Sequence, residues 1–98
     1  MSEGTAHIGA LSLVLRIPAA QSLKEKRRVL KSLKDRIRAH FNASVDEIGE
    51  LDKWQAAALG VCMIGHGKNY ISGALEGILS LVDSVGELEL TSHRLEFL

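Results

Sequence analysis

The stretch IGALSLVLRIPAAQSLKEKRRVLKSLKDRIRAHF, residues 8–41, joins a strand pattern to a helix pattern. Apolar residues alternate along its first part until Pro18, which is typical of a β-strand. Ser22 and Glu25 have the spacing of a capping box, in which two side chains bond the free amides at a helix start. The apolar residues that follow recur at helical spacings, and they are Leu23, Leu30, Leu33, Ile37 and Phe41. A strand followed by an amphipathic helix is therefore predicted.

Two more strand patterns come after this helix. Residues 42–49 predict a strand with a bulge near Asp46 and Glu47, because Val45 and Ile48 have opposite parity and both suit burial. Residues 54–64 are apolar at both parities, which predicts a strand covered on both faces.

The last third of the chain predicts a second helix and a closing strand. Asn69 can cap this helix, and Gly86 suits a left-handed position at its end. Residues 88–98 return to strand-like alternation. The order β-α-β-β-α-β predicts an α+β fold, the ferredoxin-like split β-α-β sandwich, whose four-stranded antiparallel sheet carries two helices on one face. Right-handed crossovers place the first and third strands at its centre.

Length and composition predict a single cytoplasmic domain. The chain has 98 residues, 46% of them apolar and 24% charged, so we expect one domain over residues 1–98, flexible only at residues 1–6. The apolar runs are shorter than the roughly 20 residues of a membrane helix, and no export leader is recognised, so no membrane contact is expected. The lone cysteine, Cys62, fits a reducing compartment.

The net charge of zero conceals a strong asymmetry. Residues 24–38 hold eight of the 12 Lys and Arg residues and only two acids, which leaves the rest of the chain acidic. Six of these bases fall within an arc of about 120° on the first helix. They are Lys24, Arg27, Arg28, Lys31, Lys34 and Arg38. A basic helix face of this kind is typical of a phosphate-backbone contact, so RNA or a ribosomal particle is the expected partner. A solvated face that only balances acids elsewhere is the alternative.

Several segments make the chain resemble the YlxP-type family of small bacterial proteins. The most specific is Ser22 to Arg28, and the others are residues 15–18, 32–36, 41–45, 47, 54–55 and 59–61. The resemblance implies a ferredoxin-like fold and a bacterial cytosolic protein, often encoded near translation and ribosome-maturation genes. It implies no established activity.

Two residues leave alternatives open. Lys26 falls within the apolar stripe of the first helix, so its side chain either snorkels toward the sheet edge or points into a functional groove. Trp54, the only tryptophan, either closes the end of the core with Phe41 or stacks on a base.

The sheet face away from the helices should carry small side chains, among them Ala10, Ser12, Gly60 and Cys62. It offers no aromatic residues for the base stacking of an RNA-recognition motif. This open face either forms the interface of a homodimer or is simply exposed to solvent. The alternative function is therefore an oligomeric scaffold or ligand-sensing domain, whose basic helix binds an acidic protein or a small anion.

Other motifs are weak. The turn formed by His66, Gly67 and Lys68 can hold an anion at the start of the second helix, or serve only as a connector. A P-loop is excluded, because His66 occupies the position where a P-loop requires lysine. The four histidines lack metal-ligand spacing, and no nucleophile with a base is apparent. We therefore expect a non-catalytic protein with no metal and no cofactor.

Overall fold

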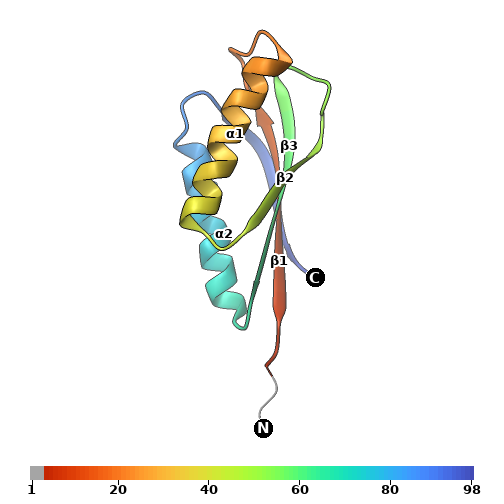
Figure 1. The fold of residues 1–98 in the computed structure, drawn as a ribbon. Helices are drawn as coiled ribbons and strands as arrows, with labels where there is room; N and C mark the ends of the chain where they lie inside the picture. The colour runs from red at the N-terminus through yellow and green to blue at the C-terminus, as the bar shows by residue number, and fades with distance from the viewer. Residues whose placement is uncertain (1–3) are drawn as a thin grey trace.

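A four-stranded antiparallel sheet carries two helices on one of its faces (Figure 1). The computed structural model describes residues 4–98, so part of the flexible segment expected at residues 1–6 lies outside it. The strand order is β2-β3-β1-β4, with β1 and β3 at the centre. The elements are β1 (His7–Arg16), α1 (Leu23–His40), β2 (Ser44–Gly49), β3 (Ala56–Gly65), α2 (Lys68–Asp83) and β4 (Glu89–Phe97). The predicted ferredoxin-like fold is confirmed.

The predicted capping pattern sets the start of α1. The Ser22 hydroxyl oxygen accepts a hydrogen bond from the Glu25 amide at 3.1 Å, and the Glu25 carboxylate accepts one from the Gln21 amide at 2.6 Å. The return bond therefore reaches one residue further back than in the standard capping box. It ties the first turn of α1 to Gln21, in the segment after β1.

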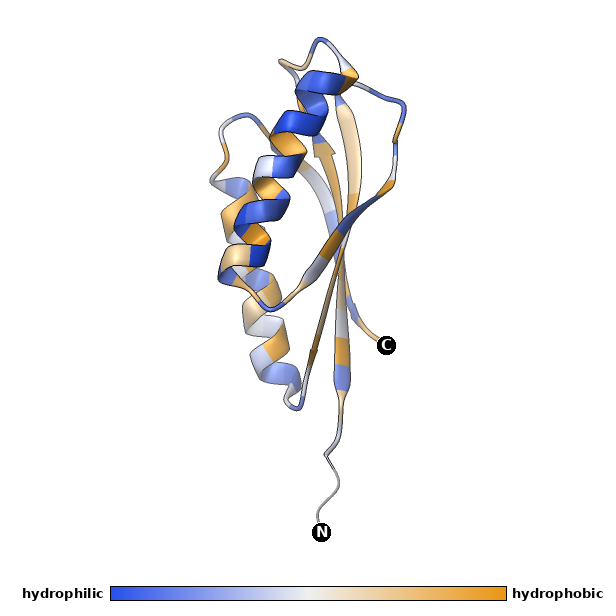
Figure 2. Cartoon of the chain, viewed as in Figure 1, coloured by the Kyte–Doolittle hydropathy of each residue, from blue (hydrophilic) through white to orange (hydrophobic). Residues whose placement is uncertain are grey.

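The hydrophobic core lies between the sheet and the helices. Leu11, Leu13 and Leu15 of β1 are buried there together with apolar residues of both helices (Figure 2). Helix α2 lies close to β1 at Gly9, where an added Cβ would lie 2.5 Å from Cγ2 of Ile71. Glycine at this position lets the helix pack directly on the strand.

The edge strand β2 has the predicted bulge, but Ile48 is not buried as expected. The bulge falls at Ile48, between Glu47 and Gly49, directly after the predicted positions Asp46 and Glu47. It turns Ile48 onto the open face of the sheet, across Gly60, and leaves 61% of its side chain exposed. Val45 is buried as predicted.

The prediction that β3 is covered on both faces is also wrong. Its residues Leu59, Val61 and Met63 face the helices, but Cys62 and Ile64 are exposed on the other side. The error arose because the small residues of β3 count as apolar in the sequence pattern, although their side of the strand is not covered.

Both predicted ends of α2 are corrected. The N-cap is Gly67, without a side-chain hydrogen bond, instead of Asn69. The helix ends with Ser84 in the right-handed region, and no glycine among residues 4–98 has a positive φ, so Gly86 is not a left-handed cap. Neither α1 nor α2 is long and apolar enough to cross a membrane.

Candidate nucleic-acid interface

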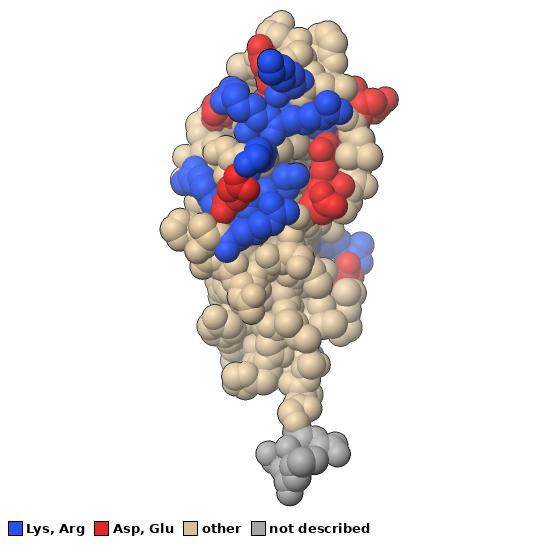
Figure 3. Space-filling view, in the orientation of Figure 1, with Lys and Arg blue, Asp and Glu red and all other residues tan. Residues whose placement is uncertain are grey.

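The basic residues of α1 lie on its solvent side. Figure 3 shows Lys and Arg side chains gathered over the half of the molecule that α1 covers, while the other half is largely uncharged in this view. Lys24 and Arg27 are exposed, Lys34 is half-buried, and none of the three makes an ion pair with a carboxylate of residues 4–98. These three are the centre of the candidate interface.

Three of the six predicted residues have acidic neighbours. Arg28 lies 3.2 Å from Glu87, while Lys31 and Arg38 lie 2.7 Å and 3.8 Å from Asp35. A hydrogen bond from Lys31 lowers the pKa of the Asp35 carboxyl, and the nearby positive charges lower it further. All these side chains are at least half exposed, so the pairs are weak and a phosphate can compete for the cations.

Arg38 has a second, structural role. Its Nη2 donates a hydrogen bond to the main-chain oxygen of Val45 at 2.9 Å, which ties the end of α1 to β2. Sequence periodicity placed Arg38 on the basic face but could not predict this bond. Arg38 therefore contributes charge to the interface with less freedom to move.

Lys26 is fully buried, with 1% of its surface exposed. Its ammonium donates hydrogen bonds to the main-chain oxygens of Glu50 at 2.6 Å and Lys53 at 2.8 Å, and it lies 2.8 Å from Oε2 of Glu47. It reaches the sheet edge as one interpretation expected, but the ammonium is bound by protein oxygens instead of water. Lys26 therefore fastens the loop between β2 and β3 to α1.

The loop that Lys26 holds has a strained turn. Glu50 adopts a left-handed backbone conformation, with φ at 59°, which residues other than glycine rarely adopt. Its main-chain oxygen accepts bonds from Lys26 and from the Lys53 amide. The Glu50 carboxylate also bonds Lys53, and this hydrogen bond raises the pKa of the lysine.

Trp54 projects from the end of this loop. Its side chain is 53% exposed, so the prediction that it closes the core is wrong. The neighbouring Gln55 is fixed, because its amide nitrogen donates bonds to the main-chain oxygens of Pro18 and Ala20, both at 3.1 Å. Trp54 thus lies beside the segment that leads into α1, at the end of the helix that holds Lys24.

The turn His66, Gly67 and Lys68 lies at the start of α2, as predicted, and its role as an anion loop stays a prediction. The Lys68 ammonium lies 5.5 Å from the centre of the Phe97 ring, an arrangement suited to a cation–π contact. This lysine belongs to a different end of the sheet from the α1 bases. Residues 4–98 bring together no group of three potential metal-ligating side chains.

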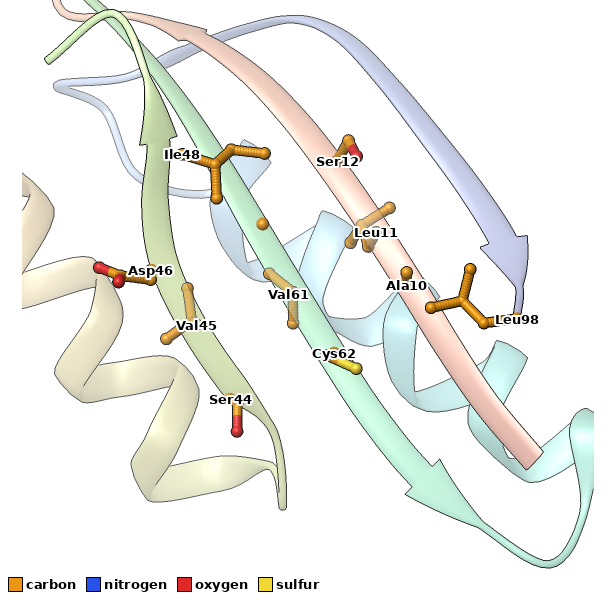
Figure 4. A pocket seen from close by; sticks show the side chains of 11 residues that line it. Ala10, Leu11, Ser12, Ser44, Val45, Asp46, Ile48, Val61, Cys62 and Leu98 are labelled. Atoms are coloured by element: carbon orange, nitrogen blue, oxygen red, sulfur yellow. The ribbon is translucent and has the colours of Figure 1, made fainter. Parts of the chain in front are cut away.

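The open sheet face has a shallow apolar groove that sequence periodicity missed. Ala10, Ser12 and Cys62 form its floor, while Ile48 and Leu98 flank it (Figure 4). The displacement of Ile48 by the bulge in β2 creates one wall. The parity conflict of Val45 and Ile48 predicted the bulge, but it did not predict that Ile48 would be exposed on this face.

The fold and these contacts define a small ferredoxin-like α+β protein. Among solved structures the chain is similar to two designed proteins, Foldit4 and Ferredog-Diesel. Foldit4 is 14% identical, with a TM-score of 0.51 and coverage of 96% of this chain and 97% of that one. Ferredog-Diesel is 13% identical, with a TM-score of 0.50 and coverage of 98% and 88%. At these identities the likeness concerns the fold alone.

Sequence comparison places the chain more narrowly. The family model described as "Protein of unknown function (DUF503)" matches residues 8–95. The chain is also 38% identical to "Uncharacterized protein YlxP" of Bacillus subtilis (strain 168). The match extends over 78 residues, which are 80% of this chain and 85% of that protein. The chain belongs to the DUF503 family, and the resemblance inferred from its motifs is confirmed.

Proposed function

We propose that this protein is a non-catalytic RNA-binding module whose helix α1 contacts the phosphate backbone, with a ribosomal RNA as the favoured partner. The observation that carries the proposal is the set of Lys24, Arg27 and Lys34, which have no ion-pair partner among residues 4–98. An uncompensated basic face attracts a polyanion because binding releases counterions. The acidic remainder of the chain gives the approaching RNA one preferred orientation.

The weak pairs around this centre extend the interface. Lys31 is 76% exposed and pairs only with the half-exposed carboxylate of Asp35, so it can exchange Asp35 for a phosphate at little cost. Arg28 can do the same, since its contact with Glu87 is solvent-exposed. The interface thus spans about four turns of α1.

Trp54 supplies a second type of contact. Exposed aromatic rings bind unpaired bases by stacking, which contributes about 1–3 kcal/mol for each base. The residues on either side of Trp54 are held in place, because Lys26 bonds the Lys53 carbonyl and Gln55 bonds the segment before α1. We therefore propose that single-stranded RNA follows α1 toward Trp54.

Fluorescence anisotropy with a labelled, mixed-sequence RNA tests the proposal. The double variant Lys24→Glu and Arg27→Glu should bind at least about tenfold more weakly than the unmodified protein. The matched control is Arg36→Glu with Lys68→Glu, which changes the net charge equally but away from the basic face. Equal losses in the two variants would contradict a localised interface.

The salt dependence of binding gives an independent measurement. Phosphate contacts from Lys24, Arg27, Arg28, Lys31 and Lys34 to single-stranded RNA predict a slope of about −3.5 for log K against log salt. Polyglutamate serves as a competitor that mimics an acidic protein surface. If polyglutamate displaces the RNA as effectively as unlabelled RNA does, the preferred partner is an acidic protein and the RNA proposal is wrong.

A further inference from the structure

The face of the sheet opposite the helices is apolar and uncovered along most of its length. Four of the seven large hydrophobic side chains exposed in residues 4–98 lie on it, and they are Val14, Ile48, Ile64 and Leu98. Between them the central strands present only small side chains, such as Ala10, Ser12, Gly60 and Cys62. A second sheet can therefore approach closely over the centre and contact larger side chains toward both ends.

One row of residues across this face has a particular charge order. The strand registers pair Asp46 with Gly60, Gly60 with Ser12, and Ser12 with Arg94. An acid on the edge strand β2 and a base on the edge strand β4 thus lie level with each other, at opposite edges of the sheet. Paired residues of neighbouring strands point to the same face, so both charges border the same apolar surface.

We propose that this face binds a second copy of the chain around a two-fold axis that runs close to the strand direction. Such an axis lays β2 of one copy over β4 of the other, and β3 over β1. Because the row is level, Asp46 of each copy then faces Arg94 of the other. Two identical ion pairs border the interface, as an isologous contact requires.

The same axis places each end of the apolar face against the same end of the other copy. The end of the face that carries Ile64 and Leu98 meets its own counterpart, so apolar side chains cover one another. The other in-plane axis, across the strands, would place Asp46 over Asp46 and the Ile64 end over the end that carries Arg16. The charge order therefore selects the axis along the strands.

Arg94 is able to make this contact. It is 77% exposed, and its present partner is Glu96 on the same strand at 3.3 Å. A guanidinium has five N–H donors, so it can keep Glu96 and still bind a carboxylate from above. Sheets that pack face to face lie about 10 Å apart, a gap that an arginine and an aspartate side chain together can span.

The size of the face predicts the strength of the dimer. Four strands about 4.8 Å apart and about 30 Å long give roughly 570 Å² for each copy, or about 1,100 Å² in total. Stable specific interfaces start near 1,200 Å². The dimer should therefore be weak and reversible, with a dissociation constant in the micromolar range.

Sedimentation velocity on the full chain tests the pairing, without any nucleic acid present. The unmodified protein should pass from monomer to dimer between about 5 µM and about 500 µM. Asp46→Arg and Arg94→Asp should each weaken the dimer by about tenfold or more, because each puts like charges opposite one another. The double variant, with both residues exchanged, should restore dimerisation. The matched control Arg36→Asp, on α1, should leave it unchanged.

Cys62 gives a second measurement on the unmodified protein. Its thiol is exposed on this face, so dimerisation should slow its reaction with an alkylating reagent as the protein concentration rises. A chain that stays monomeric at about 500 µM, with a concentration-independent alkylation rate, would overturn the proposal. A dimer that both single variants retain, or that the exchanged pair does not restore, would equally exclude this interface.

Discussion

The ammonium nitrogen of Lys26 lies 2.6 Å from the main-chain oxygen of Glu50, 24 residues further along the chain. The bond joins α1 to a turn whose backbone adopts the left-handed conformation. A buried cation therefore compensates a strained loop, and both features lie beside Trp54.

Replacing Lys26 with methionine should destabilise the protein by about 3–5 kcal/mol, because the largely buried Glu47 carboxylate loses its ion-pair partner and two carbonyls lose their donor. Urea denaturation measures this loss. Lys31→Met is the matched control; its ion pair is exposed, so its cost should be under about 1 kcal/mol. Equal costs would show that the buried contacts add no net stability.

Two glycine-to-alanine substitutions should have opposite effects on stability. Gly9→Ala should cost about 1–3 kcal/mol, because the new Cβ would overlap Ile71 of α2. Gly73→Ala should add about 0.5–1 kcal/mol, because that helical position has open space around it. Thermal or urea unfolding compares the two, and a tolerated Gly9→Ala would contradict the close approach of α2 to β1.

Glu50→Gly should leave stability unchanged or raise it by up to about 1 kcal/mol, since glycine adopts the left-handed conformation without a steric penalty. The pKa of Lys53 should fall toward its ordinary value, because its hydrogen bond to the Glu50 carboxylate is lost. NMR titration of the lysine checks this shift. An unchanged Lys53 pKa would show that another group raises it.

Asp35→Asn should strengthen RNA binding by about two- to threefold, because the acid that pairs with Lys31 on the basic face becomes neutral. Asp83→Asn is the control of equal charge change on α2. Anisotropy measures both, and an equal gain in the two variants would place the RNA away from α1.

Stability in acid should depend on the same pair. The lowered pKa of Asp35 stabilises the folded state above the ordinary carboxyl value of 3.8, and this contribution is lost as the pH falls through the lowered value. Lys31→Met should raise the Asp35 pKa and so reduce the loss in this window. Carboxylate NMR titration, with denaturation at several pH values, tests the sign.

The sequence predicted the fold well where local signals agree with the packing. The alternation of β1 and the Ser22–Glu25 cap needed no tertiary information, and the order of elements then determined the sheet. The errors have two different causes. The exposure of Ile48 depends on the space above Gly60, which is a tertiary feature. The end of α2 is set by local hydrogen bonds from the Ser84 amide, so Gly86 does not act as the cap.

The site was predictable only as a set of helix positions. Helical periodicity put six bases on one arc, but it could not show that Arg38 bonds the Val45 carbonyl or that Asp35 pairs with Lys31. The role of Lys26 was equally hidden, because its acceptors are main-chain oxygens of a distant turn. Trp54 was misplaced because a lone aromatic residue at a strand start gives no indication of which way it points.

Both helices occupy one side of the sheet, and this layering has a consequence for any pairing through the other side. Two copies joined sheet to sheet would present the basic faces of their α1 helices outward, in opposite directions. A short oligonucleotide could then contact only one basic face, whereas a long, folded transcript could wrap around the dimer and bind both basic faces. Avidity would thus discriminate between ligands by their length before any base is read.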